Sequence, residues 1–327
     1  MNIKRIIKIN YKVDVKELIK LDGGFRNECF KVDDGKRNYI FIIYKKGKSI
    51  KSSITNAHFV AEYLKKKSFP TRVPIQTENN EKIIQIECED GMHFASLYNY
   101  LSGETIPWEA YTRRHIKSIG KTLSDMHFYL RNVDIPSELH FKNWKSDTIK
   151  EIKLMRKYFK DVEPWIEKKL KVKLNWNVID KLFQFIKTIE QHDKCILHYD
   201  FVRGNILFSD RLNKKLDTYP ICGILDFEKV CLGPKVADIA RTLAFLIIDC
   251  KYKNERTVRK RFLKSGYRKR GKSDFFEDSK KLDMLIHYFW LRDFWKFLVH
   301  NPYEYLHMNE HYKRTAEKLL KKKYIIP

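Results

Sequence analysis

Paired cysteines are absent from this sequence. Its six cysteines are scattered over 327 residues, and no two of them form a C-x-x-C pair. Zinc sites and disulfide frameworks need cysteines at recognisable spacings, so the pattern argues against both and fits a reducing compartment. A disordered chain is also excluded, because 43% of the residues are hydrophobic and 14% are aromatic.

Long hydrophobic runs are missing as well. The longest apolar stretch lies near residues 243–248, far below the ~20 residues that a membrane-spanning helix needs. The N-terminal segment 1–8 is basic, but no apolar core of a signal peptide follows it. We therefore expect a cytoplasmic protein with no membrane partner.

Acidic residues are few relative to basic ones. The chain holds 41 Asp and Glu against 66 Lys and Arg, a formal net charge of +25 that can indicate nucleic-acid binding. Most of the bases are spread along the chain, but the segment 251–272 holds eleven of them and a single acid, Glu255. Nucleic-acid binding would favour interleaved aromatics, and this segment offers only Tyr252 and Tyr267. A nucleic-acid partner is therefore not expected.

Repeats and Pro- or Gly-rich linkers are absent, yet the two parts of the chain differ in character. The first part alternates short β-type segments with turn signals around one helix at 55–67. The second part is mainly helical, interrupted by two short apolar strands at 206–208 and 221–225. The sequence therefore predicts an α+β fold of two lobes, with an antiparallel sheet and one helix in residues 1–98 and a mainly helical lobe in residues 99–327.

The strongest chemical signal is the segment H-Y-D-F-V-R-G-N at 198–205, followed by I-L-D-F-E at 224–228. Phosphoryl transfer needs a carboxylate beside the attacking hydroxyl and hard oxygen ligands for the magnesium on the phosphates. Asp200 begins a loop, Asn205 follows in the same loop, and Asp226 comes at the C-terminal end of the second strand. These three oxygen-bearing side chains can therefore converge on one cavity.

With these motifs the chain resembles the aminoglycoside phosphotransferase and choline kinase family, relatives of protein kinases that phosphorylate small molecules. Further motifs that carry the resemblance are Gly23-Gly24-Phe25-Arg26-Asn27, Glu62, L-S-G-E at 101–104, Gly120 with Met126-His127, and Gly233-Pro234 with Ala237-Asp238. The resemblance covers most of the chain and implies a bilobal protein-kinase-like fold.

The same resemblance implies roles for the site residues. Asp200 would be the catalytic base, and Asn205 and Asp226 would be the ligands of Mg²⁺. ATP or GTP would lie between the lobes, with a Gly-rich turn over its phosphates and backbone near the end of the sheet against its adenine. The residues implied for these nucleotide contacts are Gly23, Gly24, Asn27, Tyr98 and Leu101.

A protein kinase is excluded by the family pattern and the spacing together. Tyr199 replaces the Arg of the H-R-D motif, and Glu228 replaces the Gly of D-F-G. Only twelve positions separate Asp226 from Asp238, which leaves no room for an activation loop.

Other conspicuous residues near these motifs have structural explanations. His198 is expected to hold the catalytic loop by backbone hydrogen bonds rather than to move protons. Glu228 and Asp238 are expected to be structural acids of the helical lobe. His127 lies among apolar neighbours on a helix, which is typical of a core histidine.

The pattern departs from the family on the third strand, which usually carries a Lys or Arg that touches the phosphates and pairs with the helix carboxylate. Ile42 occupies that position, so Glu62 would lose its partner. Lys46 lies on the same strand face by the period of two and could reach back to the nucleotide. A slipped register or an arginine such as Arg26 is a second source of charge. A degraded kinase that binds without turnover is the third hypothesis.

By the same resemblance, acceptor specificity resides in the helical lobe after Asp226. Relatives that act on polyamine antibiotics line this pocket with acids, whereas the segment 251–272 is strongly basic and would repel such cations. This favours a neutral or anionic alcohol, such as a hydroxy-amino acid, a sugar or a phosphorylated metabolite. The alternative interpretation is that the segment is a solvated helix face with no role in acceptor binding.

Two other functions stay open. One is a catalytically impaired binding or structural protein of the spore-coat type, motivated by Ile42. The other is an aminoglycoside antibiotic phosphotransferase. The sequence decides neither the acceptor, nor ATP against GTP, nor the oligomeric state.

Overall fold

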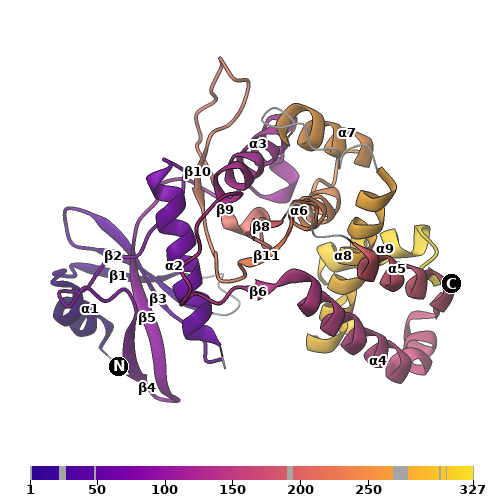
Figure 1. Ribbon diagram of the computed structural model, residues 1–327, viewed down its shortest axis with the longest axis horizontal. Coiled ribbons are helices and arrows are strands. Elements are labelled where there is room, and N and C mark those ends of the chain that lie inside the picture. Colours follow the sequence, from indigo (N-terminus) through magenta and orange to yellow (C-terminus); the bar gives the residue numbers. More distant parts are fainter. Residues whose placement is uncertain are drawn as a thin grey trace.

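The chain folds into a sheet-bearing part and a helical part that lie side by side in Figure 1. The predicted α+β arrangement, an N-terminal antiparallel sheet followed by a mainly helical region, is confirmed. The computed structural model describes residues 2–21, 27–47, 49–189, 194–267, 279–301, 303–306 and 308–326.

The N-terminal part is built on a five-stranded antiparallel sheet of order β1-β2-β3-β5-β4. Its β-branched and aromatic residues suit a pleated surface that is buried on both sides. At its centre, Ile42 pairs with Cys29 on one neighbouring strand and with Ser96 on the other. The strands are β1 (Glu17–Leu21), β2 (Glu28–Asp33), β3 (Asn38–Ile43), β4 (Ile84–Cys88) and β5 (Gly91–Asn99).

A helix covers each face of this sheet. The side chains of β3 from Ile40 to Ile43 are therefore buried, whichever face they point to. The helix α1 (Ile3–Tyr11) packs over one face, where Phe41 and Ile43 point. The helix α2 (Ile50–Lys66) packs over the other face, where Ile42 points. The predicted helix at 55–67 therefore begins earlier than expected, and α1 was not predicted.

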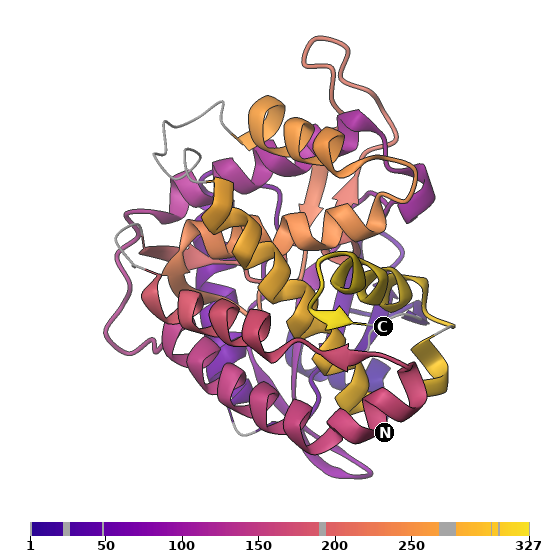
Figure 2. The same ribbon diagram turned by 90° about the vertical axis from the view of Figure 1, so that its right-hand side faces the viewer.

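The C-terminal part is mainly helical. Its central helix α6 is buried along nearly all of its length and packs against α8 and α3. In Figure 2, which looks onto this part, α4 and α5 lie in front and the sheet lies behind. The helices are α3 (Arg113–Leu130), α4 (Trp144–Leu170), α5 (Trp176–Thr188), α6 (Lys235–Asp249), α7 (Glu255–Arg259), α8 (Ser279–His300) and α9 (Glu310–Lys321).

Short strands inside the helical part position the candidate site. The predicted strand pair forms an antiparallel hairpin of β9 and β10, and β8 pairs with β11 and β11 with β6. The bounds are β6 (Lys142–Asn143), β8 (Lys194–Leu197), β9 (Ile206–Phe208), β10 (Ile221–Ile224) and β11 (Cys231–Pro234). The other short elements are β7 (Lys173–Leu174), β12 (Ile325–Ile326), η1 (Trp108–Ala110), η2 (Arg203–Asn205), η3 (Lys260–Gly266) and η6 (Tyr303–Leu306).

The two parts meet on the β9–β10 hairpin. In the link after β5, Glu104 exchanges two backbone hydrogen bonds with Phe208 of β9, at 2.8 and 3.1 Å. On the other strand, Thr71 bridges to Ile224, whose amide donates to the carbonyl of Pro70 at 2.7 Å. The hairpin therefore holds the sheet-bearing part in register with the loops that leave β8 and β10. In the described part of the chain, no helix combines the length and apolarity that a membrane crossing requires.

Candidate active site

The loop between β8 and β9 brings Asp200 and Asn205 together. Asp200 is buried, and its Oδ2 accepts a hydrogen bond from the Nδ2 of Asn205 at 3.2 Å. The same amide donates to the backbone carbonyl of Asp200 at 2.9 Å, so the loop is closed on itself by one side chain. The amide oxygen of Asn205 stays available for a ligand, because both of these hydrogen bonds use its nitrogen.

Asp226 enters the same region from the neighbouring strand. The amide of Leu225 donates to the carbonyl of Asn205 at 2.9 Å, which fixes the end of β10 against the catalytic loop. Asp226 then adopts a left-handed backbone (φ +60°), an uncommon conformation that is enriched at functional sites. Asp226 thus directly follows a residue that is bonded to the loop of Asp200 and Asn205. That the three side chains act together, and their chemical roles, stay predictions.

A second layer of contacts holds this loop in place. Asp238 on α6 is fully buried and accepts hydrogen bonds from the amides of His198 and Tyr199, at 2.9 and 2.8 Å. His127 approaches the same carboxylate at 3.1 Å. Burial would raise the pKa of Asp238, but its contacts with His127 and His198 outweigh burial and lower it. The carboxylate thus stays ionised and clamps the loop, as expected of a structural acid.

His198 also behaves as expected. Its Nε2 lies 3.1 Å from the carbonyl of Leu225, and its Nδ1 accepts from the amide of Asp200 at 3.2 Å. One ring nitrogen donates and the other accepts, which is the pattern of a neutral imidazole. Burial lowers the pKa of His198, in agreement with that state. The ring joins the catalytic loop to the end of β10.

Two cations that the sequence interpretation missed hold the carboxylate of Asp200. The Nζ of Lys229 lies 2.6 Å from one oxygen, and the Nη2 of Arg241 lies 3.1 Å from the other. Burial raises the pKa of Asp200, but the two cations together outweigh burial and bring it well below its ordinary value. The sequence feature that could have identified these two cations is their spacing from the motifs. Lys229 follows Asp226 by three residues, and Arg241 follows Asp238 by nearly one helical turn.

The predictions for Lys46 and Glu62 need correction. Lys46 does not reach back into the site, because β3 ends at Ile43 and the strand alternation no longer applies beyond it. Its ammonium contacts the carbonyl of Asp90, at the β4–β5 turn, and lies 3.4 Å from that residue's carboxylate. Glu62 has not lost its partner, since Lys82 binds it at 2.7 Å. That pair lies beside β4, the edge strand at the opposite end of the sheet from β1 and β2.

Neutral side chains fill the space beside Ile42. The hydroxyls of Tyr44 and Tyr98 are hydrogen-bonded to each other, and His58 on α2 lies 2.6 Å from the Tyr98 hydroxyl. Burial lowers the pKa of His58 to about 3, so the imidazole is uncharged at neutral pH. Three uncharged, hydrogen-bonded side chains therefore occupy the region where the family pattern predicts an ion pair.

Asn27 lies at the junction of the two parts. Its Nδ2 donates to Glu228 at 2.6 Å, and its Oδ1 accepts from the amide of Lys45 at 3.1 Å. These bonds place Asn27 against the segment that follows Asp226, and its part in a turn over the phosphates stays a prediction. Gly23, Gly24 and Arg26 lie outside the described residues.

Tyr98 and Leu101 bracket the link between the two parts. Tyr98 ends the buried portion of β5, and the side chain of Leu101 packs close to Gly223 on the β9–β10 hairpin. Both residues therefore stand beside the space between sheet and hairpin. Their adenine contacts remain a prediction.

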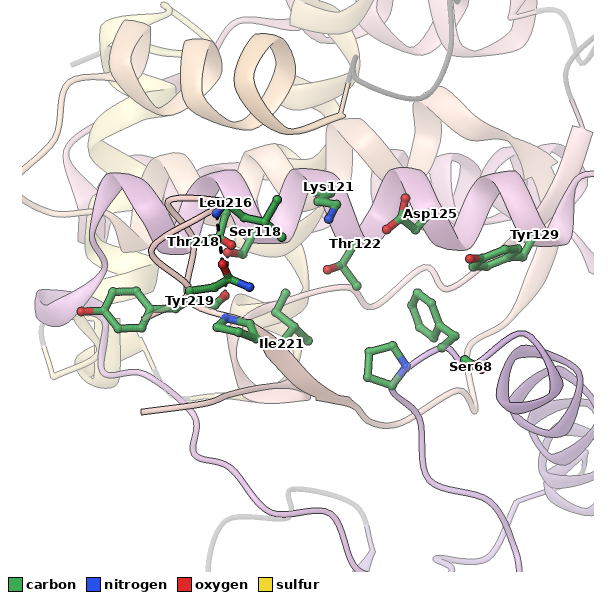
Figure 3. Close-up of a pocket in the computed structure, with 14 residues that line it drawn as sticks. Ser68, Ser118, Lys121, Thr122, Asp125, Tyr129, Leu216, Thr218, Tyr219 and Ile221 are labelled. Carbon is green, nitrogen blue, oxygen red and sulfur yellow. Dashed lines mark hydrogen bonds between the residues drawn. The ribbon is translucent and has the colours of Figure 1, made fainter. Parts of the chain in front are cut away.

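A separate hollow is drawn in Figure 3. It is lined by α3 residues that include Ser118, Thr122 and Asp125, by Phe69 and Pro70, and by the end of the loop before β10. Asp200, Asn205 and Asp226 do not line it. This hollow is therefore distinct from the convergence described above.

The metal expected from the family can be tested against the residues present. Among the described residues, no group of three or more His, Cys, Asp and Glu could hold a metal ion. Magnesium on a nucleotide usually has one or two protein carboxylates, and waters and phosphates complete its shell. Asn205 and Asp226 fit that requirement, because they would offer an amide and a carboxylate oxygen from adjacent strand ends.

An antiparallel sheet joined to a helical lobe, with an Asp-Asn-Asp convergence beside their junction, defines the class of kinase-like phosphotransferases. The chain belongs to the phosphotransferase enzyme family, whose model matches residues 17–264. The expectation from the sequence motifs is thereby confirmed at the level of the family.

Individual relatives are distant. Hydroxylysine kinase from Bos taurus is 24% identical over 201 residues, which cover 58% of this chain and 51% of the relative, so the match spans about half of that protein. An amicoumacin kinase solved with AMP-PNP, Ca²⁺ and its antibiotic superposes with a TM-score of 0.75 at 13% identity, covering 98% and 93% of the two chains. A microcompartment-associated aminopropanol kinase gives 0.73 at 14% identity, covering 98% and 97%. These structures show a shared fold.

Proposed function

We propose that this protein transfers the γ-phosphate of ATP to a hydroxyl group of a small molecule. The observation that carries the proposal is the meeting of Asp200, Asn205 and Asp226 at the ends of β8 and β10. A phosphoryl transition state is loose, so catalysis depends on positioning and electrostatics more than on covalent chemistry. These residues supply both.

Asp200 would orient the acceptor hydroxyl. Its ionised carboxylate can accept the hydroxyl hydrogen, and Lys229 and Arg241 fix the carboxylate in one orientation. Because these cations lower the pKa of Asp200, the residue acts first as an orienting acceptor and takes the proton late in the transfer. Asn205 and Asp226 would hold magnesium, which when bound neutralises charge on the β- and γ-phosphates.

The acceptor would lie beyond Asp200, against the helical lobe. There two guanidinium groups lie near the ring of Tyr199, those of Arg241 and Arg292 at 5.4 and 5.5 Å from its centroid. Acids accompany them, since Asp293 approaches Arg241 at 3.7 Å and Glu151 binds Arg292 at 2.5 Å. Charges of both signs beside the carboxylate favour a small acceptor that carries both signs, a hydroxy-amino acid above all. The names of two similar kinases, which act on hydroxylysine and aminopropanol, support an amino-bearing alcohol.

The basic segment 251–272 does not decide the acceptor's charge. In its described portion, Arg256, Lys260 and Lys264 recur every four residues and are exposed, which is the pattern of a solvated helix face. Glu255 meanwhile binds Arg259 and also Lys318 from α9. The segment thus serves packing between helices as well as solubility.

The test is a screen of hydroxyl compounds for magnesium-dependent nucleotide consumption. The panel would hold hydroxy-amino acids, amino alcohols, sugars and aminoglycosides, each with ATP and with GTP, beside an Asp200→Asn control. Product phosphorylation would be confirmed by mass spectrometry. We expect transfer to a hydroxy-amino acid with ATP and a loss of about 10²- to 10⁴-fold in the control.

Other results would redirect the assignment. Transfer to aminoglycosides together with protection of a sensitive host would identify an antibiotic kinase. Magnesium-dependent nucleotide binding without transfer to any compound would support the impaired, binding-only alternative. Equal rates for the wild type and the Asp200→Asn control would contradict the proposed mechanism.

A further inference from the structure

The segment between α2 and β4 carries an arginine near the end of β10, the strand that leads to Asp226. This segment runs along β10, where Thr71 bridges to Ile224 in parallel and the amide of Ile224 donates to Pro70 at 2.7 Å. Arg72 is the next residue after the bridge, and Asp226 follows Ile224 by two positions. The parallel bridge therefore places Arg72 level with Leu225, one residue before the proposed metal ligand.

The other side of this segment is fixed to the sheet. The amide of Val73 donates to the side chain of Asn99 at 2.7 Å, and Pro74 bridges to Tyr98. The guanidinium carbon of Arg72 lies 5.4 Å from the ring centroid of Tyr98. Arg72 is half-buried and makes no ion pair with any residue in the described ranges. Its charge is thus held in place with no carboxylate bound to it.

Cys29 lies within electrostatic range of Arg72 and of two carboxylates that follow β10. Cys29 on β2 lies opposite Ile42 on β3. Burial raises the pKa of Cys29, Arg72 lowers it, and Glu228 and Asp226 raise it further. The guanidinium and the two carboxylates therefore share the region between β2, β3 and the end of β10.

The neighbouring cations are engaged elsewhere. Lys46 binds Asp90 at the far turn, and Lys82 is held by Glu62 at 2.7 Å. Lys229 is held by Asp200 at 2.6 Å. On the strand itself, Ile42 is apolar and its neighbours Tyr44, Tyr98 and His58 are hydrogen-bonded without charge.

We propose that Arg72 is the cation that contacts the phosphates of the bound nucleotide, in place of the third-strand residue that is Ile42 in this chain. The inference rests on the proposed function. A guanidinium presents a planar fork that matches phosphate oxygens, and stacking against an aromatic ring leaves that fork free. The neutral Tyr44–Tyr98–His58 chain then closes the back of the site and needs no counter-charge.

The assignment is tested by calorimetric titration of the full chain with Mg²⁺ and AMP-PNP, and separately with adenosine. We expect Arg72→Gln and Arg72→Met to weaken AMP-PNP binding about 10- to 100-fold, as for loss of a charge-assisted hydrogen bond. Adenosine carries no phosphate, so its affinity should stay within about twofold. Arg72→Met keeps an apolar side chain over Tyr98. It therefore tests the loss of the charge even if the Gln variant fails to fold.

The controls are Arg131→Gln, which removes an arginine–aromatic contact at the end of α3, and Lys82→Gln, which removes a rival cation. Both should bind AMP-PNP as the wild type does. If Arg72→Met keeps wild-type affinity for AMP-PNP, or a rival variant alone loses it, the assignment of Arg72 is wrong while the proposed function stands. If the wild type itself binds no AMP-PNP, the proposed function falls, and the assignment of Arg72 falls with it.

Discussion

At the scale of single residues, the proposed chemistry depends on how Asp200 is surrounded. A carboxylate that is almost fully buried stays ionised here because two cations contact its two oxygens separately. Arg241 is itself anchored, with its Nε donating to the carbonyl of Tyr199 at 2.7 Å. Lys229 is partly exposed and comes from the short loop after Asp226. Arg241 therefore belongs to the core, whereas Lys229 borders the proposed transfer site.

This difference predicts the effect of Lys229→Met. Removing the ammonium frees one carboxylate oxygen to rotate and reduces the positive charge at the transfer site. We expect kcat to fall about 10- to 100-fold, while KM for the nucleotide changes less than about threefold. Steady-state kinetics on the acceptor found by the screen would measure both. Lys260→Met removes an exposed lysine from η3 as the matched control, and an unchanged kcat in Lys229→Met would contradict the role.

The sequence could predict the residues of the active-site loops but not the position of Arg72. Asp200 and Asn205 lie in one loop, and Asp226 follows the hairpin that this loop leads into, so spacing alone predicts that they lie in one region. The position of Arg72 depends on a bridge between Thr71 and Ile224, which are 153 positions apart. The same holds for Lys82, whose pairing with Glu62 depends on the order of strands in the sheet.

At the scale of elements, α4 shows why part of the fold was not predicted. Its buried residues, among them Ile152, Met155 and Phe159, have helical spacing but are separated by many charged residues. One of these, Glu151, is partly buried and joins α4 to α8 through Arg292 and Lys296. Without the partner helix in view, these positions look like an exposed and unremarkable charged stretch.

The contact of Glu151 with Arg292 and Lys296 should make the free energy of unfolding depend on pH. Burial raises the pKa of Glu151, but Arg292 and Lys296 outweigh it and lower the pKa from 4.5 to about 2. A carboxyl with a depressed folded-state pKa stabilises the fold fully above its unfolded pKa and loses that contribution as the pH falls through the folded value. We therefore expect the free energy of unfolding to decline between pH 5 and pH 2, by roughly 2–3 kcal/mol from this group.

The measurement is denaturant unfolding of the wild type and Glu151→Gln across that pH range. The variant should be less stable at pH 7 by about 3 kcal/mol, because it leaves two cations without their carboxylate. Its stability should also fall less steeply below pH 5. Parallel slopes for the two proteins would show that Glu151 does not contribute to acid unfolding.

The link between the two parts is a second element whose backbone matters. Gly103 has φ +126°, and a Cβ there would meet the Sγ of Cys222 and the carbonyl oxygen of Phe208. We expect Gly103→Ala to destabilise the protein by about 1–3 kcal/mol and to disturb the pairing of Glu104 with Phe208. Thermal unfolding would detect the loss. Gly204→Ala, at a glycine with open space around its Cβ direction, should be nearly neutral in the same assay.

At the scale of the whole molecule, several contacts join the sheet-bearing part to the helical lobe, and α2 also packs against α3. Three of the contacts involve the β9–β10 hairpin and the segment after it: the Glu104–Phe208 pairing, the Thr71–Ile224 bridge and the hydrogen bond from Asn27 to Glu228. These three contacts flank the space where the nucleotide is proposed to bind. A nucleotide that contacts both sides would add a further connection, so its binding should stabilise the two parts as one unit.

Nucleotide binding should therefore raise the unfolding temperature in two separable steps. Adenosine would stabilise the wild type modestly, and AMP-PNP with Mg²⁺ would add about 2.7 kcal/mol at a concentration of 100 times its Kd. Asp226→Asn should keep the adenosine effect and lose most of the magnesium-dependent increment, because a neutral amide is a weaker ligand for a hard cation. Asp161→Asn, an exposed acid on α4, controls for the change in net charge. If Asp226→Asn retains the whole increment, the metal is held by other groups. The loop after β10 would then connect the lobes without taking part in nucleotide binding.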